Sequence, residues 1–130
     1  MYTAQNDVLR SSLLPILLGD SRAAHALSFK IYIRCGVRSC ICDSRSSFLD
    51  LIDPSSSFFD MISDSEDAVL LEGLRYIAEE SDYLLVLVPC SERFERLISE
   101  HREFFESRFI LRTRENLFNS EPFLALLKGE

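Results

Sequence analysis

The sequence predicts an α/β fold: three layers, doubly wound, with a mostly parallel sheet of about five short strands between helices. Short apolar runs of strand length alternate with segments whose apolar residues repeat at helical spacing. The runs at residues 13–18 and 83–88 are apolar throughout, which is typical of strands covered on both faces. Each run is followed by a turn and a helical pattern, as in a doubly wound sheet.

The first unit covers residues 13–35. Its strand ends at Gly19, and Asp20 or Ser21 can cap the helix that follows. Alanines near the helix start let helix and strand approach closely, and Gly36 ends the helix. The face that we expect to be buried carries Ala24, Leu27, Ile31 and Cys35, and the face turned away carries His25, Lys30 and Arg34.

The middle of the chain predicts two weaker strands and a second helix. Residues 37–43 form the second strand, residues 44–57 a loop with one helical turn, and residues 58–62 a third strand near the sheet edge. Ser63 and Glu66 have capping-box spacing. The apolar stripe of the helix that follows is Leu70, Leu71, Leu74, Ile77 and Ala78.

The second half begins with the most apolar run, residues 83–88, which we expect to be the central strand, closed by Pro89. Ser91 can cap a third helix, residues 108–112 form a fifth strand, and Asn119 or Ser120 caps a last helix that Gly129 ends. The broad apolar face of the third helix carries Phe94, Leu97, Ile98, His101, Phe104 and Phe105.

Composition narrows the class of protein. A chain of 130 residues is expected to form one domain, here residues 13–112 after a lead-in of residues 1–12. The net charge is −7, and basic residues, twelve Arg and two Lys, are too few to favour nucleic-acid binding. No apolar run reaches membrane-span length and the N-terminus lacks a signal-peptide core, so we expect a cytoplasmic protein that binds no membrane.

The four cysteines predict neither a metal site nor a disulfide. Cys40 and Cys42 would share one face of a strand, but no C-x-x-C pair and no neighbouring histidine complete a zinc set. Small buried thiols in a reducing compartment are the expectation, together with Cys35 and Cys90.

Polar residues after the strands indicate where a ligand would bind, because open α/β sheets bind ligands beyond the carboxyl ends of their strands. The pattern Gly19-x-Ser21-x-x-Ala24, with Asp43 as a ribose-binding acid, would suit a dinucleotide. Ser21 in place of the second glycine and the negative charge of Asp20 count against it.

Nucleophilic catalysis is the other alternative at these strand ends. Cys90 precedes a helix start, where a thiolate would be stabilised. Both histidines, His25 and His101, fall within predicted helices, so neither a Cys-His pair nor a Ser-His-Asp set is evident. We therefore predict no catalytic residue in this chain.

Two stretches of the chain carry a recognisable combination of features. The first has a glycine turn and small-residue helix that begin at Gly19 and a helix end at Cys35-Gly36-Val37, and the second has Leu87-Val88-Pro89-Cys90 before a helix. In these features, over about residues 13–128, the chain resembles the N-terminal, pre-ATP-grasp domain of ATP-grasp ligases, in particular carboxylate-amine ligases of the D-aspartate ligase and carbamoyl-phosphate-synthase-like group. The family usually continues Gly-Asp after Pro-Cys, and this chain has Ser91-Glu92.

The resemblance implies a Rossmann-like domain that supplies one wall of a substrate pocket, with residues 113–130 as a linker helix toward an ATP-grasp domain. ATP, Mg²⁺ and the catalytic groups would belong to that downstream domain, so this chain would bind no cofactor and would not be a complete ligase. A surface for a homodimer is also implied. The substrate-binding residues expected for a small carboxylate or amino acid are Gly19, Asp20, Ser21, Arg22, Pro89, Cys90 and Ser91.

Within that set, Arg22 would pair with a substrate carboxylate, and Ser21 and Ser91 would offer donors at helix starts. The runner-up function is a stand-alone Rossmann-like binding or interaction module without chemistry.

Overall fold

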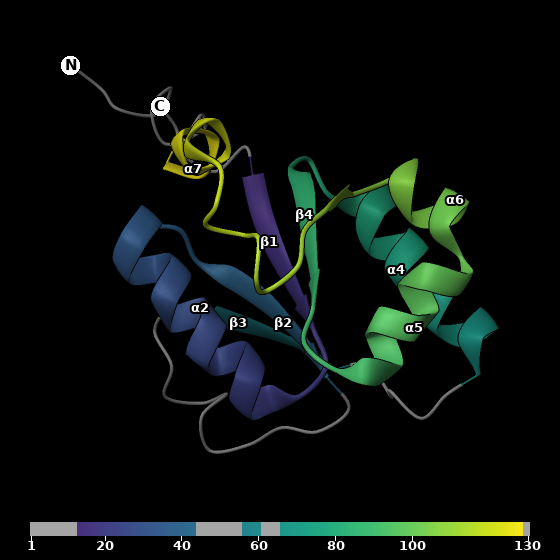
Figure 1. Ribbon diagram of the computed structural model, residues 1–130. Coiled ribbons are helices and arrows are strands. Elements are labelled where there is room, and N and C mark those ends of the chain that lie inside the picture. Colours follow the sequence, from purple (N-terminus) through teal and green to yellow (C-terminus); the bar gives the residue numbers. More distant parts are fainter. Residues whose placement is uncertain (1–12, 44–55, 61–65, 129–130) are drawn as a thin grey trace.

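A computed structural model describes residues 13–43, 56–60 and 66–128. It contains one five-stranded sheet in which every pair of neighbouring strands is parallel, in the order β3-β2-β1-β4-β5. The predicted Rossmann-like α/β class is therefore confirmed (Figure 1). The strands are β1 (Leu13–Leu18), β2 (Ser39–Asp43), β3 (Ser56–Asp60), β4 (Leu84–Pro89) and β5 (Ile110–Leu111).

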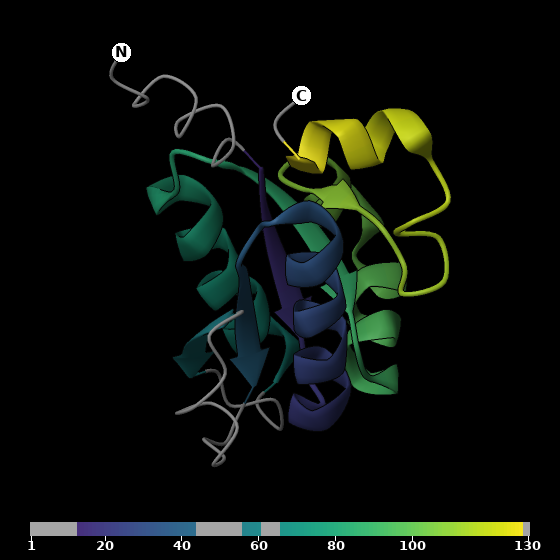
Figure 2. The same ribbon diagram turned by 90° about the vertical axis from the view of Figure 1, so that its left-hand side faces the viewer.

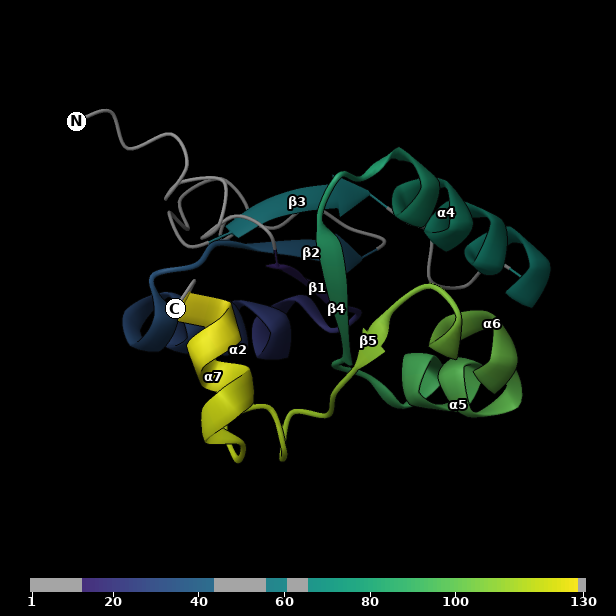
Figure 3. The ribbon, with the colours of Figure 1, turned by 90° about the horizontal axis from the view of Figure 1, so that it is seen from above.

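Helices cover both faces of the sheet, which gives three layers. Viewed from above, one face carries α2 and α7, and the other carries α4, α5 and α6 (Figure 3). The helices are α2 (Ser21–Cys35), α4 (Asp67–Glu80), α5 (Glu92–Glu100), α6 (Arg102–Glu106) and α7 (Glu121–Lys128).

The middle strand of the sheet is β1. The prediction that residues 83–88 form the central strand was therefore wrong. β4 pairs with β1 over six residues, from Leu13 opposite Leu84 to Leu18 opposite Pro89. Its other neighbour, β5, pairs through only two residues. The apolar sequences of β1 and β4 identify both as interior strands. They do not indicate which of the two lies in the middle of the sheet, because both strands are covered on two faces.

The smaller strands shift from their predicted bounds. β2 begins at Ser39 rather than at residue 37, and β3 begins at Ser56 rather than at residue 58. Residues 61–62 of the predicted third strand lie outside the described residues. Pairing with β2 sets the register of β3, with Ser39 opposite Ser56. Arg38 also donates to the Ser56 carbonyl at 2.8 Å, which fixes the start of this edge strand. The loop predicted at residues 44–57 is wrong at its end, because residues 56 and 57 belong to β3. The rest of that loop, residues 44–55, lies outside the described residues.

Helix α2 forms as predicted and ends at Gly36, which has φ +70° and whose N–H donates to the Tyr32 carbonyl. One expectation was wrong: His25 is buried and not turned to solvent. The helix packs on β1, β2 and β3, so its buried face is wide enough to include His25 and Ser28. Both side chains have interaction partners. The predicted core positions Ala24, Leu27, Ile31 and Cys35 are all buried.

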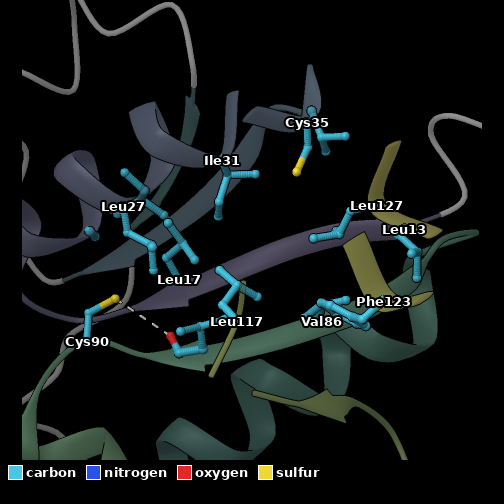
Figure 4. Close-up of a cluster of buried hydrophobic side chains, with 14 residues drawn as sticks. Leu13, Leu17, Leu27, Ile31, Cys35, Val86, Cys90, Leu117, Phe123 and Leu127 are labelled. Atoms are coloured by element: carbon cyan, nitrogen blue, oxygen red, sulfur yellow. Dashed lines mark hydrogen bonds between the residues drawn. The ribbon is translucent and has the colours of Figure 1, made fainter. Parts of the chain in front are cut away.

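Helix α7 closes the same face near the C-terminal end of α2 (Figure 2). Ser120 accepts a hydrogen bond from the Phe123 N–H at 3.3 Å, as its predicted capping role requires. Leu117, Phe123 and Leu127 are buried in the core (Figure 4). The segment expected to be a linker helix therefore also completes this layer.

The predicted third helix is divided into α5 and α6 at His101, whose backbone has φ −125° and ψ 43°. His101 is consequently not in mid-helix. Its Nε2 lies 3.2 Å from Oδ2 of Asp67, and Arg93 Nη2 lies 2.6 Å from Oδ1 of the same carboxylate. One aspartate at the start of α4 thus joins α4 to α5 and to the helix break.

The start of α4 also differs from prediction. The helix begins at Asp67 with Glu66 as N-cap residue, and no side-chain capping bond forms there. Glu66 is therefore not the third residue of a capping box. Its proposed partner, Ser63, lies outside the described residues. Asp67 in the first turn places a negative charge at the positive end of the helix dipole instead.

The Asp67 cluster predicts acid sensitivity. Hydrogen bonds from Arg93 and His101 lower the pKa of the Asp67 carboxyl. A carboxyl whose pKa is lower in the folded state stabilises the fold above its unfolded pKa and loses that contribution as the pH falls through the folded value. We expect Asp67→Asn to lower the urea midpoint at pH 7, and the difference from wild type to shrink below about pH 4.

The matched control is Asp82→Asn, at an exposed position before β4. It should leave the urea midpoint nearly unchanged at both pH values. An Asp67→Asn deficit that stays constant down to pH 2.5 or so would contradict the electrostatic origin of the effect.

Candidate functional site

Two turns hold the predicted site residues: residues 19–22 after β1 and residues 89–91 at the end of β4. They meet at the point where the strand order of the sheet reverses. From β1 the chain passes through β2 to β3 on one side, and then returns to β4 and β5 on the other side. The carboxyl ends of β1 and β4, at Leu18 and Pro89, are therefore neighbours at the switch point. In open α/β sheets this is the usual position for a ligand.

Main-chain hydrogen bonds hold the first turn between its neighbours. The Gly19 N–H donates to the Cys42 carbonyl at 2.8 Å, and the Cys90 N–H donates to the Leu18 carbonyl at 2.7 Å. The end of β1 is thus fixed to the ends of both β2 and β4. The turn is accordingly a rigid part of the sheet edge.

Gly19 lies directly against the second turn. A Cβ atom on Gly19, which has φ +81°, would lie 2.6 Å from Ser91 Oγ and 2.8 Å from Phe94 Cδ2. Ser91 caps α5, since its Oγ accepts from the Phe94 N–H at 3.4 Å. The first residues of α5 can therefore approach β1 only because position 19 has no side chain.

Asp20 occupies the N-terminus of α2. Its Oδ1 accepts from the Ala23 N–H at 3.4 Å, and its φ of 42° makes it the one non-glycine residue with positive φ among those described. Asp43, the candidate ribose-binding acid, is buried and already has a partner. A capped helix start and an inaccessible acid both count against a dinucleotide site. Arg22 is exposed on the first turn of α2.

Cys90 is a core residue. Its side chain is 1% exposed, and Sγ lies 3.8 Å from the Val88 carbonyl oxygen, to which it donates (Figure 4). Burial raises the pKa of the Cys90 thiol to about 12, and the negative charges of Asp20 and Glu95 add to the rise while Arg114 opposes it. The thiol therefore lacks the thiolate character of a nucleophile.

The other cysteines are also free thiols. Cys40 and Cys42 share a face of β2, as predicted, and contact one core cluster. Their mutual hydrogen bond lowers the pKa of Cys40 and, together with burial, raises that of Cys42 well above its usual value. Within the described ranges, no three His, Cys, Asp or Glu side chains lie together in a metal-binding arrangement.

A cavity lies one strand further along this edge, and the sequence did not predict it. A cavity of about 270 Å³ lies between α5 and the segment after β5. Of the predicted site residues, only Pro89 lines it. Arg112 and Thr113 follow β5, so applying the strand-end rule to the fifth strand as well would have found them.

The fold defines a Rossmann-like α/β domain, and the two turns and the cavity lie at the carboxyl ends of its strands. Comparison of the chain with protein-family models, curated proteins and solved structures returned no match. In the part of the chain that the structure describes, no helix combines the length and apolarity needed to cross a membrane.

The Gly19 contact predicts a large difference between two glycine substitutions. Gly36 also has positive φ, but nothing lies within 4 Å of a Cβ built there. Gly36→Ala should cost only the left-handed backbone strain, about 1 kcal/mol of unfolding free energy. Gly19→Ala should cost about 3 kcal/mol or more, because it adds overpacking to that strain. Urea unfolding of both variants measures the difference, and equal losses would refute the close contact.

Thiol reactivity is predicted to be confined to Cys40. At pH 8 a thiol with a pKa of about 12 is ionised in only about one molecule in ten thousand. Iodoacetamide labelling of the native protein, followed by peptide mass spectrometry, should modify Cys40 first and leave Cys90 unmodified. The urea-unfolded chain, in which all four should react, is the control. Labelling of native Cys90 at its unfolded rate would contradict this assignment.

Proposed function

We propose that this chain is the substrate-side, N-terminal domain of an ATP-dependent carboxylate-amine ligase, with a Rossmann-like pre-ATP-grasp fold. The observation that carries the proposal is the contact between the Gly19 turn and the Ser91 turn at the switch point of the sheet. These are the two segments on which the sequence resemblance to the ligase family rests. Their contact is consistent with a single substrate-facing surface.

In this proposal the two turns form one wall of a substrate pocket. Ser91 and Gly19 pack too closely to leave a cavity between them, so a ligand would lie on the solvent side of the turns. Arg22 is exposed there and would pair with the substrate carboxylate. The Ser91 hydroxyl, whose oxygen accepts from Phe94, keeps its proton for donation to the ligand. Ser21 would contribute its main-chain N–H.

The opposite wall would come from a downstream ATP-grasp domain. That domain would also supply the ATP, Mg²⁺ and catalytic groups, and the isolated chain would have no ligase activity. The proposed setting is the cytoplasm, where ATP and amino acids are both present.

The test uses the full-length gene product. The reading frame after Glu130 should encode an ATP-grasp domain, or a separate partner should supply one. ADP release should then depend on a carboxylate and an amine. Arg22→Ala should raise the KM for the carboxylate about tenfold or more, because a charge-assisted hydrogen bond is lost.

Arg96→Ala, at an exposed position on α5, is the matched control and should leave KM unchanged. An unchanged KM in Arg22→Ala would remove Arg22 from the site. The absence of an ATP-grasp domain in the gene and in any partner would overturn the proposal in favour of a stand-alone binding or interaction module.

A further inference from the structure

The cavity beyond Pro89 has a chemically mixed lining. Pro89, Ile98 and Leu111 form apolar walls where β4, α5 and β5 meet. Its volume of about 270 Å³ is close to the lower end of the range for small-molecule sites. The cavity therefore suits a metabolite of a few non-hydrogen atoms with some apolar surface.

Two cations and one anion line the same cavity. Arg102 at the start of α6 and Arg112 after β5 are the cations, and Glu95 in the first turn of α5 is the anion. Two guanidinium groups favour a carboxylate, which they can bind through paired hydrogen bonds. A carboxylate in the same lining disfavours a dianion such as phosphate and favours a ligand that also carries a positive charge.

The orientation of Arg112 is fixed by its neighbours. Its guanidinium carbon lies 4.3 Å from the centre of the Phe123 ring. Its Nε is buried and has no hydrogen-bond partner among the described residues. Stacking on an aromatic ring holds the guanidinium in place beside the cavity that Arg112 lines, so its positive charge stays there.

Arg102 can adapt to a ligand. Its side chain is 61% exposed, and the ion pair that it makes with Glu106 uses Nε at 3.5 Å. An exposed pair of this kind contributes little stability, so the side chain can rearrange at low cost. The two terminal nitrogens are not used in that pair and can donate to a carboxylate.

A rigid turn forms the remaining wall. Thr113 N–H donates to Asn116 Oδ1 at 2.9 Å, and Asn116 N–H donates to Thr113 Oγ1 at 3.1 Å. These reciprocal bonds fix both side chains in the lining of the cavity. The Asn116 amide nitrogen and the Thr113 hydroxyl proton are then available as neutral donors.

We propose that this cavity binds a small zwitterion, a molecule that carries a carboxylate and an ammonium group on a short apolar frame, as an α-amino acid does. Arg102 and Arg112 bind the carboxylate, and Glu95 faces the ammonium group. The inference goes beyond the proposed function, because it concerns a different part of the sheet edge and would apply equally to a stand-alone binding module.

The test is a ¹H–¹⁵N NMR titration of the 130-residue chain. The probes are glycine, L-alanine and L-glutamate as zwitterions, with acetate, methylammonium and inorganic phosphate for comparison. At least one zwitterion should shift the amides of Ser99, Thr113 and Asn116 with a dissociation constant of about 1 mM or tighter. Acetate and methylammonium should bind at least about tenfold more weakly.

Variants locate the ligand. Arg102→Gln and Ser99→Phe change exposed positions, so both should fold, and each should weaken zwitterion binding at least about tenfold by removing a cation or filling the cavity. Arg112→Gln should do the same, with its amide spectrum as the check on folding. Arg96→Gln, on α5 but outside the lining, should bind as wild type does.

Three outcomes would overturn the inference. The first is shifts confined to Gly19, Asp20 and Ser91, which would move the ligand to the switch point and leave the proposed function intact. The second is tighter binding of phosphate than of any zwitterion. The third is the absence of amide shifts with any zwitterion at about 20 mM. That outcome would leave the proposed function to be decided separately, by the ligase activity of the full-length protein.

Discussion

The absence of a side chain at Gly19 is the constraint on which the rest of this edge depends. The start of α5 packs onto the end of β1 so closely that even a methyl group would meet Ser91 and Phe94. Phe94 is fully buried, and its position fixes how α5 lies on the sheet. The start of the helix therefore packs against the end of β1, and the helix packs on β4. The same contact closes the switch point itself, leaving no space between the turns.

β1 and β4 hold the two helical layers together because their side chains alternate between the faces. Leu17 and Val86 belong to the cluster under α2 and α7, while Ile16 and Leu87 belong to the cluster under α4, α5 and α6. Six opposed residue pairs join the two strands. A change in their register would move side chains of both layers at once, since a one-residue slip reverses the faces.

Local signals account for what the sequence could predict. The bounds of β1, the end of α2 at Gly36 and the caps of α5 and α7 follow from residues within a few positions of each other. His101, at the helix break, pairs with Asp67, which is 34 positions away, and Arg38 donates to the first residue of β3. Contacts between residues so far apart in the sequence leave no signal in a local sequence pattern. The candidate turns were predictable as strand ends, whereas the cavity depends on how α5 lies beside the segment after β5.

The close packing at the switch point also explains why the cavity does not lie between the two turns. In open α/β sheets the two turns at a switch point usually diverge and leave a crevice for the ligand. Here Gly19 and Ser91 are in contact, and Leu117 from the segment after β5 is buried in the same cluster as Cys90. The cavity lies beside Pro89, between α5 and the segment after β5. Arg102 and Arg112 line it together with Glu95, so a carboxylate bound there would have two cations within short range. At longer range the net charge of −7 repels anions.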